Sequence, residues 1–226
     1  MILSPLTVCD LEIQKNPLWN HIVSERMDMV QTIATVLLNI TTLMSFQEAA
    51  NLYRLVERTA RLPGEIAEAG VYHGGSALIM ANANKRRKKM HLFDTFAGIP
   101  ETTKGVDTIQ TGALMTGSQE VHALRLALGE MDGLTKFHVG LFPDSARDVP
   151  SSTVFSFVNL DMDIYQATLD GLEFFYPRMV KGGIIVCHDY AALSCPGVKK
   201  AVDEFSEHKP ETVIDLWHSQ VAIVKS

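Results

Sequence analysis

Short apolar segments alternate with amphipathic ones over most of the chain, beginning at Gly64. Seven short apolar runs, most of them bounded by Gly, Pro or Ser, are typical of buried strands. These runs are Glu65–Val71, Met90–Phe93, Thr135–Val139, Val154–Leu160, Gly183–Cys187, Val213–Leu216 and Val221–Val224. The segments between them favour helices over Ser76–Lys85, Ser118–Leu128, Thr168–Tyr176 and Gly197–Glu207. The alternation predicts a three-layer α/β fold with a mostly parallel sheet of seven strands, and the closely spaced last two strands predict a C-terminal antiparallel hairpin.

The first sixty residues carry a different pattern, with apolar positions at helical spacing over residues 20–43. Ser45, with Glu48 three positions later, has the pattern of a capping box and predicts the start of a second helix. We therefore expect two parts in the chain. An N-terminal helical extension or lid would cover residues 1–60, and an α/β domain would cover residues 61–226.

Composition and charge narrow the range of partners. The 20 Lys and Arg residues against 26 Asp and Glu residues give a net charge of −6, which disfavours a dedicated nucleic-acid binder, and the basic run Lys85–Lys89 is expected to be a solvated loop. No run approaches the ~20 apolar residues of a membrane helix. The three cysteines, Cys9, Cys187 and Cys195, form no CxxC pair, so we expect a reduced, cytoplasmic location. The strongly apolar segment Ile22–Ile40 predicts a homodimer formed through the N-terminal helices.

Acidic and imidazole side chains follow two of the predicted strands. Asp161 and Asp163 come directly after the fourth strand, and His188 and Asp189 come directly after the fifth. Because the carboxyl ends of parallel strands meet at one edge of the sheet, these side chains are expected to lie around one point. Carboxylates and imidazole bind metal ions and accept protons, so the pattern predicts a site with a metal and a base. Two simpler interpretations stay open: Asp163 only caps the next helix, and His188 is only a sheet-edge histidine.

The first predicted strand ends in a glycine-rich turn, Gly70–Ser76, which is followed by a helix. Such a turn lets the backbone approach a ligand, although a tight turn without a ligand has the same pattern. Asp94 ends the second strand, 26 positions after Glu68, where nucleotide-binding α/β proteins carry the acid that binds ribose hydroxyls. The two elements predict an adenosine-containing ligand. Phe142, after the third strand, is either a wall for adenine or plain core.

Several segments of this sequence, in order from about Thr41 to the last strand, match one known family. They are Pro63–Ser76, Phe93–Pro100, Gly140–Ser145, Leu160–Thr168, Tyr176–Pro177, Gly182–Gly183, Asp189–Tyr190 and Gly197–Phe205. On these segments the chain resembles the S-adenosylmethionine-dependent O-methyltransferases of the macrocin O-methyltransferase type, which modify sugars and phenols in natural-product pathways. The absence of a GxGxxG motif argues against the alternative of a nucleotide-dependent oxidoreductase.

The resemblance implies a Rossmann-like methyltransferase sheet and a binding site for S-adenosylmethionine. The residues implied to contact this donor are Glu68, Gly70, Tyr72, Gly74, Ser76, Asp94, Thr95, Phe142 and Asp144. The implied acceptor is a hydroxyl of a small molecule, a sugar or a phenolic natural product.

The resemblance also implies a divalent metal, usually magnesium, held by Asp161 and by an acidic pair after the fifth strand, with Asp163 as the general base. In this chain the pair is His188–Asp189, so one acid is replaced by histidine. Magnesium prefers oxygen ligands, whereas imidazole suits manganese, iron or zinc. Three interpretations follow: a softer metal binds, His188 acts as a catalytic base, or the metal site has weakened. The last one leaves an alternative function, a catalytically degenerate methyltransferase fold that binds the donor or a partner.

Overall fold

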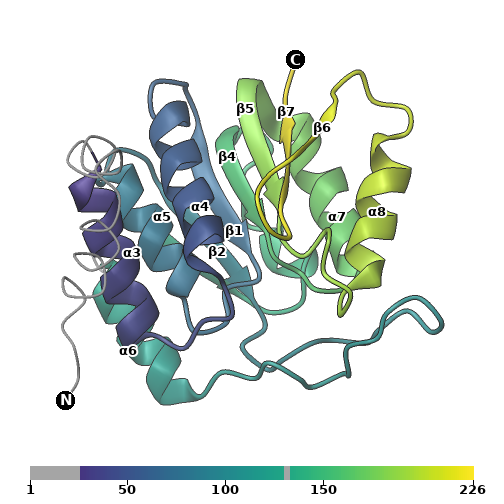
Figure 1. Ribbon diagram of the computed structural model, residues 1–226, viewed down its shortest axis with the longest axis horizontal. Coiled ribbons are helices and arrows are strands. Elements are labelled where there is room, and N and C mark those ends of the chain that lie inside the picture. Colours follow the sequence, from purple (N-terminus) through teal and green to yellow (C-terminus); the bar gives the residue numbers. More distant parts are fainter. Residues whose placement is uncertain (1–25, 130–132) are drawn as a thin grey trace, which may run out of the picture.

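The computed structural model describes residues 26–129 and 133–226, and its centre is a seven-stranded sheet in the order β3-β2-β1-β4-β5-β7-β6 (Figure 1). The strands are β1 (Glu65–Ala69), β2 (Met90–Asp94), β3 (Thr135–Val139), β4 (Phe155–Leu160), β5 (Met179–Cys187), β6 (Val213–Asp215) and β7 (Val221–Val224). The first five strands are parallel to one another, whereas β7 is antiparallel to both β5 and β6. The structure therefore confirms the predicted three-layer, mostly parallel sheet with a C-terminal hairpin.

Helices cover both faces of the sheet (Figure 1). They are α3 (Met27–Asn39), α4 (Phe46–Thr59), α5 (Gly75–Asn84), α6 (Ser118–Leu128), α7 (Tyr165–Phe175) and α8 (Pro196–Ser206), with short 3-10 turns η2 (Asp144–Ala146) and η3 (Tyr176–Arg178). Successive residues of β5 alternate between the two faces. Ile184 belongs to the core under α3, α4 and α5, and Ile185 belongs to the core under α7 and α8. None of the helices within the described ranges is long and apolar enough to span a membrane.

The N-terminal helices take part in the main core. Ile33 of α3 and Leu52 of α4 are fully buried in the same cluster as the residues of α5. The capping box at the start of α4 is confirmed, because the Ser45 N–H donates to Glu48 Oε2 at 2.8 Å and the Glu48 N–H donates to Ser45 Oγ at 3.3 Å. Ile22, which opens the apolar segment assigned to a dimer contact, lies outside the described residues.

Two elements start three or more residues away from the sequence prediction. β5 begins at Met179, four residues before the predicted Gly183, because the register shifts between the pairs Phe155–Met179 and Phe157–Ile184, and this stretch of β5 contains Gly182 with φ of +79°. α7 begins at Tyr165, three residues before the predicted Thr168. The strand order reverses between β1 and β4, and this reversal places the ends of these two strands side by side at the carboxyl edge of the sheet.

Candidate active site

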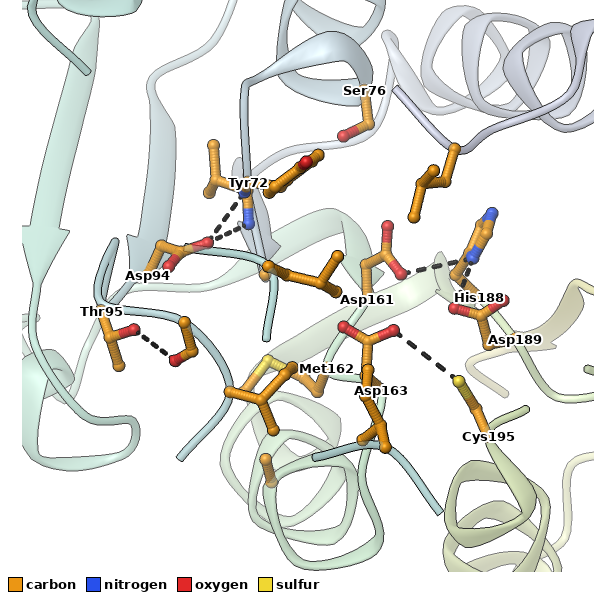
Figure 2. Close-up of a pocket in the computed structure, with 18 of the residues that line it drawn as sticks. Tyr72, Ser76, Asp94, Thr95, Asp161, Met162, Asp163, His188, Asp189 and Cys195 are labelled. Carbon is orange, nitrogen blue, oxygen red and sulfur yellow. Dashed lines mark hydrogen bonds and ion pairs between the residues drawn. The ribbon is translucent and has the colours of Figure 1, made fainter. Parts of the chain in front are cut away.

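A cavity of about 530 Å³ lies at the carboxyl edge of the sheet, where the strand order reverses (Figure 2). Its walls come from the loops after β1, β2, β3, β4 and β5, together with residues 41–44, which precede α4. Ligands of open α/β sheets bind at this place. Most of the residues predicted to bind a cofactor or a metal or to act in catalysis line this cavity: Gly70, Tyr72, Ser76, Asp94, Thr95, Phe142, Asp161, Asp163, His188 and Asp189.

The glycine turn after β1 is shaped by close packing. Gly70 has φ of +87°, and a Cβ atom on it would lie 1.7 Å from the carbonyl oxygen of Asp161. Gly74 has φ of +83°, and its Cβ would meet the side chain of Leu124 at 2.2 Å. Both positions therefore require glycine. Packing alone accounts for Gly74, which does not line the cavity, whereas Gly70 also exposes its backbone to the cavity.

Asp94, at the end of β2, anchors this turn. Its Oδ2 atom accepts hydrogen bonds from the N–H groups of Val71 at 2.6 Å and Tyr72 at 2.9 Å, and its Oδ1 atom accepts one from Phe96 at 2.6 Å (Figure 2). A carboxylate offers about four lone-pair positions, so Asp94 retains acceptor capacity toward the cavity. Asp94 therefore holds the glycine turn and also lines the part of the cavity where a ribose is predicted to bind.

Three of the residues predicted to contact the donor do not reach the cavity: Gly74, Glu68 and Asp144. Glu68 is fully buried and accepts a hydrogen bond from Asn159 at 2.8 Å, and burial raises the pKa of Glu68 to about 8 despite its hydrogen bonds. Asp144 pairs with Arg147 at 2.6 Å on the protein surface. Glu68 therefore belongs to the interior of the sheet, where it contacts Asn159 of β4, and its buried Oε2 atom forms no hydrogen bond among the described residues.

Thr95 and Phe142 line the cavity and also make contacts that stabilise the fold. The Thr95 hydroxyl donates to the carbonyl of Gly98 at 2.9 Å and so shapes the loop after β2. The Phe142 ring stacks on Phe175 in the core, with 5.7 Å between the ring centroids. Both interpretations of Phe142, adenine wall and core residue, are thus consistent with its place.

The structure brings together the predicted metal ligands from the ends of β4 and β5. The Nδ1 atom of His188 lies 3.3 Å from Asp161 Oδ1 and 3.0 Å from Asp189 Oδ2 (Figure 2). One ligand atom of each residue lies within 4.8 Å of the other two. The ring of His188 is buried, and neither ring nitrogen forms a hydrogen bond of normal geometry with the described residues.

The electrostatics of this cluster favour a charged imidazole when no metal is bound. Burial favours the neutral ring, but the carboxylates of Asp161, Asp189 and Glu48 hold the pKa of His188 well above its ordinary value. Burial also raises the pKa of Asp161, against the opposing effect of His188. His188 therefore carries a proton that a metal ion would have to displace.

Asp163 faces the cavity and does not cap α7. The N–H of Tyr165, the first residue of α7, donates instead to Asp107 Oδ1 at 2.8 Å, a contact that sequence reasoning missed. Asp163 has a strained φ of +62°, and such strain is concentrated at functional sites. Burial, together with the charges of Asp161 and Asp189, raises the pKa of Asp163 to about 8. The carboxyl group is thus a stronger proton acceptor than an ordinary aspartate.

Two further residues of the site were missed from the sequence. Cys195 lines the cavity, and its Sγ atom lies 3.8 Å from Asp163 Oδ1 (Figure 2). Glu48 of α4 is buried, and its Oε1 atom lies 3.4 Å from His188 Nε2 and accepts a hydrogen bond from Ser219 at 2.5 Å. Burial opposes the charge of Glu48, but the nearby imidazole of His188 and hydrogen bonds from Ser219 and Ser45 hold the pKa of Glu48 well below its ordinary value. Its pattern in the sequence pointed only to the capping box.

The strand order, the glycine turn, the acid after β2 and the cavity at the strand-order reversal define an α/β fold of the methyltransferase class. The fold is similar to that in the structure of the O-methyltransferase NovP, with a TM-score of 0.68, 24% sequence identity and coverage of 82% of each chain. The sequence profile of the macrocin O-methyltransferase (TylF) family matches residues 31–217, and the chain belongs to this family.

Two related O-methyltransferases are identical to this chain at about a quarter of the aligned residues. Demethyldecarbamoylnovobiocin O-methyltransferase from Streptomyces niveus is 27% identical over 183 residues, which cover 74% of this chain and 68% of that protein. The 8-demethyl-8-(2,3-dimethoxy-alpha-L-rhamnosyl)-tetracenomycin-C 4'-O-methyltransferase from Streptomyces olivaceus is 27% identical over 168 residues, covering 68% of this chain and 64% of that protein. The chain thus spans about two thirds of the length of these relatives.

Proposed function

We propose that this protein is an S-adenosylmethionine-dependent O-methyltransferase that acts on a hydroxyl of a small molecule, a sugar or a phenolic natural product. The observation that carries the proposal is that the glycine turn with Asp94 and the cluster of Asp161, Asp163, His188 and Asp189 line the same cavity. A donor at the first feature and an acceptor at the second would lie within reach of each other. Family membership and the names of the relatives support this reaction class.

In this proposal the methyl donor binds at the glycine turn and at Asp94. Replacing Asp94 with alanine is expected to weaken S-adenosylmethionine binding by about 1.5–3 kcal/mol, the range for hydrogen bonds to a charged group. Isothermal titration calorimetry measures this change, and thermal unfolding reports how far the loss of the Val71 and Tyr72 contacts disturbs the fold. Asp144→Ala serves as the comparison, because Asp144 lies outside the cavity lining. An unchanged affinity in Asp94→Ala would remove Asp94 from the donor site.

The cluster of Asp161, His188 and Asp189 fits a divalent cation. The distances of 3.3 and 3.0 Å from His188 Nδ1 to the two carboxylate oxygens match adjacent ligands around an ion with bonds of about 2.1 Å. The ring nitrogens of His188 also lack hydrogen bonds of normal geometry to the described residues, which leaves Nδ1 available as a ligand. When bound, the cation supplies Lewis-acid chemistry that lowers the pKa of a hydroxyl oxygen. The mixed donor set favours manganese, iron or zinc more than an all-oxygen site would, and magnesium less.

The residues of the chain perform the remaining steps. Asp163 takes the proton of the acceptor hydroxyl. At the same time, the hydroxyl oxygen attacks the methyl carbon of the donor and displaces the sulfur. The raised pKa of Asp163 favours the proton transfer. The walls of the cavity hold donor and acceptor in line, which supplies much of the rate by proximity and orientation. Ile99, which is buried and lines the same cavity as the acidic residues, helps to exclude water.

A second candidate is a protein that binds the donor or a partner without catalysis. The observation that favours it is His188, whose charged ring already compensates the surrounding carboxylates. Two measurements separate the candidates: donor binding by calorimetry, and methyl transfer to a panel of phenols and glycosides with magnesium, manganese or a chelator. Turnover that requires a metal supports the enzyme, whereas donor binding with no turnover under any of these conditions supports the second candidate.

We also propose a homodimer formed through the N-terminal helices. Met29, Val30 and Ile33 of α3 are buried within the protomer, but Leu38 and Leu43 are 60% and 76% exposed. Static light scattering at micromolar concentration should give the mass of a dimer, and Leu38→Asp should shift it toward the monomer. A monomeric wild-type protein would contradict the proposal.

A further inference from the structure

The segment between β2 and α6 forms one wall of the cavity. Residues 100–112 contain no helix or strand and belong to the long teal loop that extends from beside α6 to below α8 in Figure 1. A hydrogen bond of 2.8 Å from the Ile99 N–H to the carbonyl of Ala113 closes the base of this loop. Thr108 and Ile109 line the cavity. We call residues 100–112 the strap.

Asp107 attaches the strap to the start of α7. Its Oδ1 atom accepts a hydrogen bond of 2.8 Å from the N–H of Tyr165, and its Oδ2 atom accepts one of 2.7 Å from the N–H of Thr103 in the strap. The negative charge is also favourable beside the N-terminus of a helix. A Cβ atom on Gly197 of α8 would lie 1.9 Å from the same Oδ1 atom. The carboxylate of Asp107 therefore lies against the first turns of both α7 and α8.

A second contact holds the strap next to Asp107. The hydroxyl of Thr108 donates to the carbonyl of Ser194, just before α8, at 2.6 Å. The hydroxyl of Thr111, by contrast, donates to the carbonyl of Pro100 at 3.1 Å and so stays within the strap. Among the described residues, the side-chain hydrogen bonds of the strap reach other elements only through Asp107 and Thr108. A segment held by so few contacts opens at a lower free energy than the sheet does.

The contact of Asp107 also adjoins the candidate base. Tyr165 lies two positions after Asp163, and Ile164 between them is buried in a small cluster on which Ile109 of the strap packs. Asp163 has φ of +62°, and a residue other than glycine keeps such a conformation only where its surroundings hold it. The contacts that attach the strap therefore also hold the backbone of Asp163.

We propose that Asp107 is a positioning residue with two effects: it holds the strap closed over the cavity, and through Tyr165 it holds Asp163 in place. When the contacts of Asp107 and Thr108 break together, the strap moves away from α7 and α8, and small molecules enter or leave the cavity. When the contacts form again, Asp163 returns to its position. The motion of the strap is independent of the reaction. Only the effect on Asp163 as a base rests on the proposed methyltransferase function.

Amide hydrogen exchange, measured by NMR on the full chain, tests the motion. The N–H groups of Thr103 and Tyr165 bond to Asp107, and that of Ile164 bonds to the carbonyl of Met162 in the loop that carries Asp163. We expect these three amides to exchange faster than the amide of Asp161, which bonds to the carbonyl of Ala69 in β1 and reports on the sheet.

Two matched variants show whether the contacts break together. Thr108→Val removes the bond to Ser194 and leaves Asp107 intact, so the amides of Thr103, Tyr165 and Ile164 should all exchange about three- to tenfold faster, the effect of one ordinary hydrogen bond. Thr111→Val removes a bond within the strap and should leave them unchanged. The motion is wrong if the three amides exchange as slowly as that of Asp161, if the two variants act alike, or if only Thr103 responds.

Turnover tests the effect on the base. With an acceptor that the wild-type protein methylates, Asp107→Ala should lower kcat about 10- to 100-fold by misplacing Asp163, while the affinity for S-adenosylhomocysteine stays unchanged. Asp107→Asn should restore part of this loss, because its amide oxygen can still accept the N–H of Tyr165. An unchanged kcat in Asp107→Ala would show that Asp107 does not position the base. A wild-type protein that methylates no acceptor would contradict the proposed function, and the exchange measurements would still decide whether the strap and the Asp163 loop open together.

Discussion

The Asp163→Asn variant is expected to lose about 10²- to 10⁴-fold in kcat, the usual contribution of a positioned general base. Asparagine preserves the shape of the side chain but cannot accept the hydroxyl proton. The affinities for S-adenosylmethionine and for the metal should stay nearly unchanged if the metal lies among Asp161, His188 and Asp189, and a fall in metal affinity would point instead to the second possible group of ligands, Asp163, Asp189 and Cys195. Single-turnover methyl transfer, combined with calorimetry for the donor and for Mn²⁺, measures all three quantities.

The pH dependence provides a second measurement on the same variant. A base acts only when it is deprotonated, so the turnover of the wild-type protein should rise as the pH increases through the pKa of Asp163, and this rise should be absent from Asp163→Asn. Asp170→Asn is a suitable control, because Asp170 lies on α7, outside the cavity lining, and accepts a hydrogen bond from Gln166. If Asp163→Asn retains turnover, or if its metal affinity falls together with its turnover, the assignment of Asp163 as the base is wrong.

Replacing His188 with aspartate should have the largest effect on the metal-free protein. The change removes the one buried cation that faces Glu48, Asp161 and Asp189 and adds a fourth carboxylate. The free energy of unfolding should fall by about 3–5 kcal/mol, as for a buried ion pair that loses one partner. A divalent cation should restore most of this stability, and the preference should shift toward magnesium, because all the ligands would then be oxygen atoms. Denaturant unfolding with and without Mg²⁺ or Mn²⁺ measures both effects.

The same variant separates two effects: the competition between a proton and the metal for His188, and the preference of the site for one metal over another. Carboxylates hold the pKa of His188 well above its ordinary value, so the metal affinity of the wild-type protein should fall as the pH is lowered, starting above the usual range of histidine, about 6.5. His188→Asp should lack this dependence. His218→Asp is the control, because the ring of His218 also contacts Glu48, at 3.0 Å, but is exposed and does not line the cavity. Equal metal preference and equal pH profiles in wild type and His188→Asp would show that His188 is not a ligand.

Local patterns accounted for the architecture of this protein and for much of its site. Alternating apolar runs predicted the strands and the hairpin because each run is a local property of the chain, and the spacing of Ser45 and Glu48 predicted a cap that forms within one helical turn. The convergence of Asp161 with His188 also followed from a general rule, since residues after parallel strands meet at one sheet edge.

The contacts that join distant segments depend on packing and could not be predicted from these patterns. Asp107 binds the first N–H of α7 from a loop 58 positions away, which removes the alternative that Asp163 only caps this helix. Glu48 reaches His188 only because α4 packs on the sheet beside the end of β5 and the start of β7, although the local pattern of Glu48 was already explained by the capping box. Asp94 accepts hydrogen bonds from the N–H groups of Val71 and Tyr72, which lie in the glycine turn after β1. Periodicity and spacing determine which elements form and at which edge their ends lie. Only the packed structure decides which side chains share a buried charge there, because those contacts depend on how separate helices and loops fit together.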